Sequence, residues 1–325
     1  MDSSSREGLV LRIDAKICHV EIDGQRRTVP LSGKLFEQKS HEKRPLTVGD
    51  RVRIRDDDQG GAIDEVLPRQ SQLTRRAASE GEERAQVIAA NISLVLVVAS
   101  LAEPPFQPEL VDGVLAAARR ENVPAVLVLT KLDRDKKGTA DRWRDLYAAL
   151  GVTVLITSTA PELRTDEAFG QLGALLHQNR SVLCGLSGAG KSSLLNTVVP
   201  GLSLRTGSLN HIRQGRHTTT HTELIPLPGG GHVLDTPGIR SFHLFHIGAQ
   251  ETQFLFVEIA ALLPQCGYRN CLHIDEPDCA VRAALESGAI APTRHASYHA
   301  MVTAALAAER SGGGDDRSSR RGWRP

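Results

Sequence analysis

The 325-residue sequence has few aromatic residues, 4% of the total, and its net charge is only +1. The low aromatic content argues against a broad surface that stacks nucleic-acid bases. A net charge near zero points to no particular partner, so any contact with nucleic acid has to use a local basic patch. Hydrophobic residues reach 40% and charged residues 24%, as in globular proteins with hydrophobic cores. The length suffices for two or three domains.

Long hydrophobic runs are absent too. The N-terminal sequence MDSSSREGLVLRID lacks the apolar core of a signal peptide, and the longest apolar run, LVLVVASLA from Leu94, is too short to cross a bilayer. The five cysteines are an odd number, and three of them cluster late in the chain. We therefore expect a cytoplasmic protein without membrane contact or disulfide bonds, and we expect a monomer.

Residues 1–76 predict a small β-barrel. The segments LVLRID, KICHVEID, RTVPL and DRVRIR alternate apolar and polar residues, and glycines such as Gly24, Gly33 and Gly49 separate them. Short strands at this spacing favour an OB-fold. The basic stretch KSHEKRPLTVGDRVRIR allows two interpretations, a solvated rim of the barrel or a rim that binds RNA. We predict an OB-fold RNA-binding domain over these residues.

The central part of the chain, residues 77–244, predicts an α/β domain. Residues 69–92 are interpreted as a polar bridge that leads into it. From Ser93 onward, the apolar runs LVLVVAS, AVLVLT, VTVLITS and SVLCGLS alternate with segments of helical periodicity. Nearly continuous apolar strands that alternate with helices indicate a parallel sheet covered on both faces.

One stretch of this domain, GLSGAGKSS at residues 185–193, fits the phosphate-binding pattern G-x-x-x-x-G-K-[ST]. Glycines let consecutive backbone N–H groups turn toward phosphates, and the helix predicted to follow adds its positive N-terminal dipole. Lys191 is expected to bridge the terminal phosphates, and the Ser192 hydroxyl to ligate Mg²⁺. The predicted phosphate-binding residues are Gly185, Leu186, Ser187, Gly188, Ala189, Gly190, Lys191, Ser192 and Ser193.

Two further loops at predicted strand ends indicate guanine specificity. In TKLD, at residues 130–133, Asp133 is expected to accept hydrogen bonds from guanine N1–H and N2, and the stem of Lys131 to cover the base. The loop after VLITS is expected to donate a backbone N–H to guanine O6. Adenine would leave these groups unpaired, and such mismatches discriminate by roughly 10⁴–10⁵. The predicted guanine-binding residues are Thr130, Lys131, Leu132, Asp133, Ser158 and Thr159.

The stretch HVLDTPG at residues 232–238 completes the nucleotide motifs. Asp235 is expected to hold Mg²⁺ through water, and the Gly238 N–H to contact the γ-phosphate. The motif order is base loop, second base loop, phosphate loop, switch and DTPG, which is a circular permutation of the usual GTPase order. A permuted chain can build the same site because ligands of open α/β sheets bind at the carboxyl ends of strands, whatever the connectivity.

The late cysteines predict a metal centre. In CGYRNCLHIDEPDC, three thiolates and one imidazole make a closed Cys₃His set that suits structural zinc and leaves no position for a catalytic water. The alternative is a group of free or disulfide-paired thiols. Helical segments surround the cluster, so we predict a mostly helical zinc-binding domain over residues 245–310 and a disordered tail over residues 311–325. The predicted ligands are Cys266, Cys271, His273 and Cys279.

The motif order, the stretches GLSGAGKSSLLN and GRHTTT (residues 215–220) and the Cys/His cluster resemble the circularly permuted ribosome small-subunit-dependent GTPase A family. The resemblance covers nearly the whole chain. It implies hydrolysis of GTP to GDP and phosphate, stimulated by the small ribosomal subunit late in that subunit's maturation. It also implies that the barrel and the zinc module contact ribosomal RNA. Thr130 and Thr159 replace the commoner Asn and Ala, and both changes could loosen nucleotide binding.

The segment GRHTTT lies between the phosphate loop and DTPG, where a mobile switch belongs. Thr219 or a neighbouring threonine is expected to complete the Mg²⁺ shell. Ile239 follows DTPG and cannot orient a water as glutamine does, so unaided hydrolysis is expected to be slow. We hypothesise that His217 orients the attacking water once the subunit orders the switch. The alternatives are Arg213, Arg216 and a His217 that contacts only RNA or solvent.

Two other functions remain open from the sequence. An ATP-dependent kinase is disfavoured by Asp133, which suits guanine, and by the lack of a kinase acceptor site. An RNA-binding assembly protein with a decayed nucleotide site is disfavoured by the intact Lys191, Ser192 and Asp235.

Overall fold

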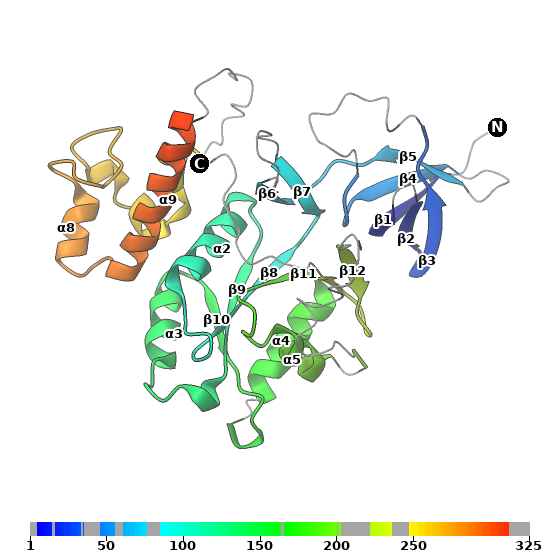
Figure 1. Cartoon of the computed structure of the whole chain (residues 1–325), viewed down its shortest axis with the longest axis horizontal. Coiled ribbons are helices and arrows are strands. Elements are labelled where there is room, and N and C mark those ends of the chain that lie inside the picture. The colour runs from blue at the N-terminus through cyan, green and yellow to red at the C-terminus, as the bar shows by residue number, and fades with distance from the viewer. Residues whose placement is uncertain are drawn as a thin grey trace. The chain divides into compact units, whose positions relative to one another are not determined.

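The computed structural model describes residues 5–14, 17–33, 35, 46–55, 61–76, 85–163, 166–199, 201–202, 222–235 and 247–311. The chain folds into two compact units, residues 1–245 and 246–325 (Figure 1). Each unit is described by itself.

The first unit begins with a five-stranded barrel. Strand β1 pairs antiparallel with both β2 and β4, and β4 pairs antiparallel with β5. A parallel bridge between Leu31 and Ile63 closes the ring, with a hydrogen bond of 3.0 Å from Ser32 N to Ile63 O. Alternating residues such as Val10, Val20 and Ile54 fill the barrel core. The strands are β1 (Ser5–Asp14), β2 (Ile17–Ile22), β3 (Gln25–Pro30), β4 (Arg51–Arg55) and β5 (Ala62–Val66).

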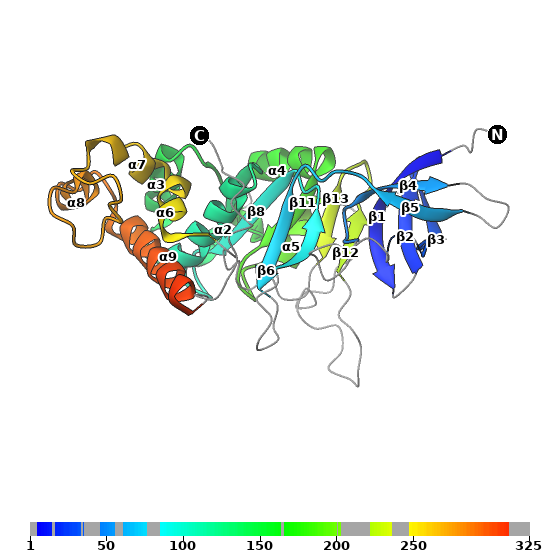
Figure 2. The ribbon, with the colours of Figure 1, turned by 90° about the horizontal axis from the view of Figure 1, so that it is seen from above.

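The central sheet continues from the barrel. Its strand order is β10-β9-β8-β11-β13-β12, and β12 pairs with β1 of the barrel at Arg12 and Glu223 (Figure 2). The five strands from β10 to β13 along this order are parallel, whereas β12 is antiparallel to β13. The strands are β8 (Leu94–Ser100), β9 (Ala125–Thr130), β10 (Thr153–Ile156), β11 (Arg180–Cys184), β12 (Glu223–Pro226) and β13 (His232–Asp235).

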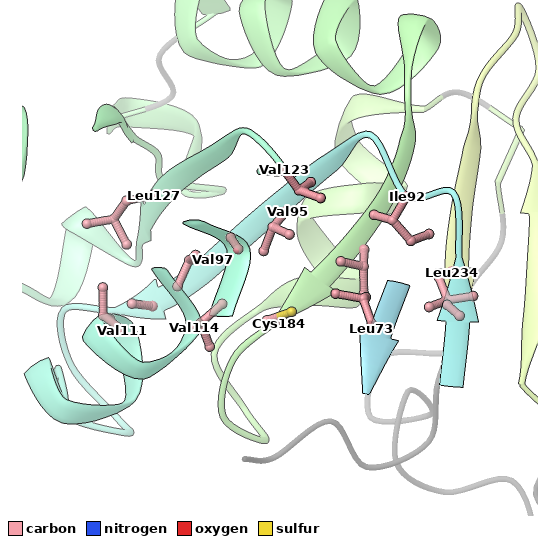
Figure 3. Packing of buried hydrophobic residues seen from close by; sticks show 14 of the residues in the cluster. Leu73, Ile92, Val95, Val97, Val111, Val114, Val123, Leu127, Cys184 and Leu234 are labelled. Carbon is pink, nitrogen blue, oxygen red and sulfur yellow. The ribbon is translucent and has the colours of Figure 1, made fainter. Parts of the chain in front are cut away.

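Helices pack on both faces of this sheet, as the apolar strands predict. In β8 every residue is buried: Val95 and Val97 pack against α2 and α3 on one face, and Leu96 and Val98 pack against α4 and α5 on the other. Figure 3 shows the first of these cores, with Val111 of α2 beside the sheet. The helices are α2 (Pro108–Arg120), α3 (Ala140–Ala149), α4 (Asp166–Gln178) and α5 (Lys191–Val198).

A β-hairpin occupies part of the region interpreted above as a polar bridge, so that interpretation is wrong. Strands β6 (Gln72–Arg76) and β7 (Ala85–Ala90) pair antiparallel as a separate sheet. Leu73 and Ala89 are buried, and both belong to the same core as Val95 (Figure 3). Strand β6 is polar apart from Leu73, whereas β7 is mostly apolar (AQVIAA) and contributes Ala89 and the partly buried Ile88 to this core.

Polar contacts fix the barrel to the start of the sheet. The fully buried Asp50 accepts hydrogen bonds from Arg69 Nε (2.7 Å) and Nη2 (3.0 Å). Glu223 of β12 forms an ion pair with Arg26 of β3, with an N–O distance of 3.0 Å. Buried charges persist only when they are paired, which accounts for the contact of Asp50 with Arg69. The partly exposed pair of Arg26 and Glu223 joins β3 of the barrel to β12 of the sheet.

The second unit is mainly helical, as expected, but its first part is not one continuous helix. Phe256 has an extended backbone (φ −107°, ψ 105°) that separates the short elements on either side. The Arg294 guanidinium lies 2.7 Å from Glu258 and 4.4 Å from the centre of the Phe256 ring. The elements are α6 (Ala249–Thr252), the 3₁₀ turns Gln253–Leu255 and Leu263–Gln265, α7 (Val257–Ala260), α8 (Ala280–Glu286) and α9 (Pro292–Ser311).

Within the described ranges, no helix has the length and hydropathy needed to span a membrane. Residues 312–325 of the predicted tail lie outside the described residues.

Candidate nucleotide site and metal centre

The predicted nucleotide residues follow strands β9, β10 and β11, which are parallel. Parallel strands bring their carboxyl ends to one edge of a sheet, where α/β proteins bind ligands. We call residues 130–133 the base loop, residues 157–159 the second base loop and residues 185–193 the phosphate loop. All three lie at this edge, although the base loop precedes the phosphate loop in the chain.

A hydrogen bond joins the base loop directly to the phosphate loop. The Thr130 hydroxyl donates to the Ala189 carbonyl at 2.6 Å, and both residues are buried. The Thr130 carbonyl in turn accepts a hydrogen bond from Leu101 N at 3.1 Å. The threonine therefore braces the two loops.

The two base loops contact each other through Asp133. The Ser158 hydroxyl donates to Asp133 Oδ1 at 2.7 Å and accepts a hydrogen bond from Ala160 N at 3.0 Å. Leu132 N donates to the Thr157 carbonyl at 3.3 Å. Ser158 is buried, while the side chain of Asp133 keeps 27% exposure. The carboxylate is thus oriented by a neighbour and still reachable by a ligand.

Lys131 adopts a left-handed backbone conformation, with φ +61°. Its ammonium group donates to the Glu103 carbonyl. Burial lowers the pKa of Lys131, and the nearby Arg134 lowers it further, whereas Glu103 and Asp133 act in the opposite direction. The side chain of Lys131 therefore extends from the base loop to the loop that follows β8, where the Glu103 carbonyl binds its ammonium group.

The phosphate loop has the backbone that its glycines predict. Gly185 has φ +151°, and a Cβ there would lie 2.0 Å from the Val98 carbonyl oxygen of β8, so only glycine fits. Gly190 has φ +94° and precedes the first residue of α5. Lys191 Nζ donates to the carbonyls of Gly185 (2.8 Å) and Leu186 (2.7 Å). Ser192 is buried in the first turn of the helix.

The remaining predicted nucleotide residues are less completely described. Asp235 ends β13, and only its main chain belongs to the described part. Thr159 is exposed. His217, Thr219 and Gly238 lie outside the described residues.

The four predicted metal ligands converge in the second unit. Among the described residues, Cys266, Cys271, His273 and Cys279 bring their ligand atoms within 4.8 Å of one another. His273 Nδ1 lies 3.6 Å from Cys266 Sγ and 3.3 Å from Cys279 Sγ. Zinc bonds of 2.3 Å to sulfur and 2.0–2.1 Å to nitrogen place tetrahedral ligands about 3.6 Å apart. The donor set and its spacing therefore fit zinc.

The surroundings of the cluster also suit a metal. His273 Nε2 lies 3.1 Å from the Oε1 atom of the buried Gln253, which leaves Nδ1 directed at the three sulfurs. Burial raises the pKa of Cys271 to about 12, so the thiolate needs a nearby positive charge. A bound Zn²⁺ would supply it.

Glu276 organises the loop between the ligands. Its carboxylate accepts hydrogen bonds from the main-chain nitrogens of Leu272 (2.6 Å) and Ile274 (2.8 Å). Burial opposes ionisation of Glu276, but these and neighbouring N–H donors outweigh it and lower its pKa. Cys18 and Cys184 lie elsewhere, buried in the barrel and in β11, as core residues.

A protein-family model described as RsgA GTPase matches residues 66–245. The chain belongs to this family. It is therefore a GTPase, a hydrolase for which the family implies a guanine nucleotide and Mg²⁺.

Curated relatives agree with this family assignment over most of the chain. The Small ribosomal subunit biogenesis GTPase RsgA of Moorella thermoacetica is 38% identical over 307 residues, 94% of this chain and 99% of that protein. The protein of the same name from Chlorobaculum tepidum is 36% identical over 308 residues, 91% of this chain and 96% of that protein.

Two solved structures share the fold. YjeQ from Thermotoga maritima matches with a TM-score of 0.75 and 30% identity, over 93% of this chain and 99% of that one. YloQ, described as a circularly permuted GTPase, matches with a TM-score of 0.71 and 25% identity, over 94% and 96%. The expected fold class is confirmed: an N-terminal barrel, a permuted GTPase sheet, and C-terminal helices with a Cys₃His cluster.

Sequence reasoning missed three residues that contact these sites. The main-chain carbonyl of Glu103 contacts the base loop, and Gln253 contacts His273. Glu276 organises the loop between the candidate metal ligands. Glu276 stands between two ligands and could have been suspected as a loop organiser. The other two lie about 30 and 20 residues from their partners, and no sequence pattern links them.

Proposed function

We propose that the chain hydrolyses GTP at the carboxyl edge of its central sheet and serves in late maturation of the small ribosomal subunit. Asp133 recognises guanine, Lys131 covers the base and Lys191 binds the terminal phosphates. A water attacks the γ-phosphorus, the bond to the β,γ-bridging oxygen breaks, and GDP and phosphate leave.

One observation carries the guanine site: the Thr130 hydroxyl meets the Ala189 carbonyl at 2.6 Å. It supports a single pocket in which the base loop and the phosphate loop contact the same nucleotide. The contact of Ser158 with Asp133 supports a carboxylate aimed at the base. Adenine would leave this carboxylate without its two donors, so GTP is the substrate rather than ATP.

The residues proposed to hold Mg²⁺ are Ser192, Asp235 and Thr219 or a neighbouring threonine. When bound, Mg²⁺ neutralises charge that develops on the phosphate oxygens. His217 is proposed to orient the attacking water, because Ile239 after DTPG has no polar group for that task. The segment that contains His217 acts only when the subunit orders it, so hydrolysis without the subunit is slow.

The ribosomal part of the proposal is supported by the relatives, which are named small ribosomal subunit biogenesis GTPases. The barrel and the zinc-binding helices are proposed to contact ribosomal RNA of the small subunit. Consistent with this, exposed arginines such as Arg27 and Arg55 lie on barrel strands. The chain is proposed to act as a cytoplasmic monomer, with domains at residues 1–76, 77–244 and 245–310.

The decisive experiment is GTP turnover by the full chain with and without purified small ribosomal subunits, with ATP as competitor. We expect slow turnover alone, on the order of 10⁻⁴ s⁻¹ as in other GTPases with incomplete sites, and a large stimulation by subunits. Excess ATP should not inhibit. The role of His217 is tested by His217→Ala, which should abolish the stimulation while GDP binding persists. No turnover even with subunits would favour a pure RNA-binding protein, and inhibition by ATP would contradict guanine specificity.

A further inference from the structure

The loop between β8 and α2, residues 101–107, lies against both the base loop and the phosphate loop. Leu101 N donates to the Thr130 carbonyl at 3.1 Å. On the other side, Pro104 Cδ lies 3.6 Å from the position that a Cβ would take at Gly188. None of the nucleotide motifs includes this loop, although it contacts two of them.

The far end of the loop is anchored in the protein core. The Phe106 ring stacks on Trp143 of α3 with 4.3 Å between ring centres, and Trp143 belongs to the core that packs against β8 and β9. Pro108 then starts α2. A loop fixed at both ends presents its middle residues in one place, which suits a positioning role.

Glu103, in the middle of the loop, contacts the base loop once and Arg134, the residue that follows the base loop, once. Its main-chain carbonyl accepts from the Lys131 ammonium, and its carboxylate pairs with Arg134 Nη1 at 3.0 Å. Arg134 also lies close to the guanine-recognising carboxylate, with its Nε 3.7 Å from Asp133 Oδ2. The guanidinium of Arg134 therefore stands between two carboxylates that attract it.

We propose that Glu103 is a positioning residue for guanine recognition, because its carboxylate holds Arg134 and so keeps Asp133 available to the base. The other oxygen of Asp133 already accepts from Ser158 at 2.7 Å. Arg134 already makes a long ion pair with the oxygen that remains, and a closer guanidinium would turn this pair into a direct hydrogen bond. Guanine N1–H and N2 would then compete with a guanidinium for the same acceptor. This inference rests on the proposed guanine site.

The test is a double-mutant cycle in the full chain, read out as affinity for a fluorescent GDP analogue. The variants are Glu103→Gln, Arg134→Gln and the double variant. Glu103→Gln keeps the main-chain contact to Lys131 and removes only the carboxylate charge. We expect it to weaken GDP binding about two- to five-fold, the range for exposed ion pairs. In the Arg134→Gln background, the same change should have no effect.

The direction of the change in GDP affinity distinguishes the proposed role of Glu103 from a general electrostatic effect on an anionic nucleotide. Loss of a carboxylate beside an anionic nucleotide should by itself tighten binding, whereas the proposal predicts weaker binding. Glu109→Gln is the matched control, since it removes another exposed carboxylate at the start of α2. It should bind GDP like the unmodified chain. The weakening by Glu103→Gln should also shrink at high salt, which screens exposed pairs.

Unchanged or tighter binding by Glu103→Gln would overturn the proposal. An equal loss of GDP affinity in the unmodified chain and in the Arg134→Gln chain would also overturn it, because the loss would then come from a change in the loop and not from Arg134. In both cases, GDP binding by the unmodified chain would still support the proposed guanine site. An unmodified chain that binds ADP as well as GDP would overturn the guanine site together with the role of Glu103.

Discussion

The nucleotide edge and the zinc loop gather their side chains in opposite ways. At the nucleotide edge, Thr130, Ser158 and Lys191 are far apart in sequence and share one edge because they follow neighbouring parallel strands. In the zinc loop, the four ligands fall within residues 266–279. The buried sheet creates the first site. For the second, we expect that a metal bound by the four residues also has to stabilise the local structure.

This difference predicts that the structures of the two sites depend to different degrees on a bound ligand. The sheet keeps its shape through two hydrophobic cores, one on each face, that need no ligand. The turn between Cys266 and Cys271 contains Tyr268, whose side chain is 49% exposed, and the exposed Arg269. Such a turn buries little apolar surface, so we expect its order to depend on a bound metal.

The largest effect is expected for Cys271→Ser. Binding of structural zinc contributes about 10–16 kcal/mol in small zinc peptides, and a buried thiolate ligand is essential to it. We expect loss of bound zinc and early unfolding of residues 246–311, while GDP still binds to the first unit. Zinc content, hydrogen exchange of the second unit and GDP affinity are the measurements.

Cys18→Ala is the control for this prediction, because Cys18 is a buried barrel residue outside the cluster. It should retain one zinc per chain. A Cys271→Ser chain that still holds zinc and keeps protected amides in residues 246–311 would show that the helices fold without the metal.

The second effect is expected for Asp133→Asn. The substitution replaces an anionic acceptor of two hydrogen bonds with an amide, and each bond to a charged group is worth about 1.5–3 kcal/mol. GDP affinity should fall by about 10²- to 10⁴-fold with little change in thermal stability. Calorimetry and thermal unfolding measure the two quantities.

Asp135→Asn is the control for Asp133→Asn and should change stability instead of GDP affinity. Asp135 accepts hydrogen bonds from Thr139 Oγ1 (3.1 Å) and Ala140 N (2.8 Å) at the start of α3, so its loss should reduce stability and spare GDP binding. Equal losses of GDP affinity in both variants would mean that the loop as a whole, and not the Asp133 carboxylate, determines binding.

The smallest effect is expected for Thr130→Val, which keeps the side-chain shape but removes the hydroxyl. The buried Ala189 carbonyl would lose its donor, at a cost of about 1–3 kcal/mol in unfolding free energy. GDP affinity should fall as well, because the two loops are no longer tied together. Urea unfolding and GDP titration would show both changes. An undiminished affinity would mean that the loops keep their positions without this bond.

The sequence predicted most of the nucleotide edge for a physical reason. Strand ends can be located from apolar runs, and parallel strands carry them to one edge, so Thr130, Asp133 and Ser158 could be placed together without knowledge of the connections. The Cys₃His cluster was predictable because its spacing is local. The nucleotide contacts of all these residues stay predictions, as do the roles of His217, Thr219 and Gly238.

Other features depend on contacts that no pattern encodes. The contact of Glu103 with Lys131 involves left-handed backbones at both residues, with φ +40° and +61°. In the hairpin of β6 and β7, the short apolar strand β7 stands inside a mostly polar stretch, and the sequence does not show its pairing with β6. The segment FLFVEIAALL is apolar except for Glu258, so its periodicity could not locate the interruption at Phe256.

The most direct test of the permuted site is an experimental structure of the full chain with GDP and Mg²⁺. We expect one nucleotide that contacts both loops, with the Asp133 carboxylate on the guanine edge and Lys191 Nζ on the phosphates. A nucleotide that contacts the phosphate loop while its base lies away from Asp133 would contradict it.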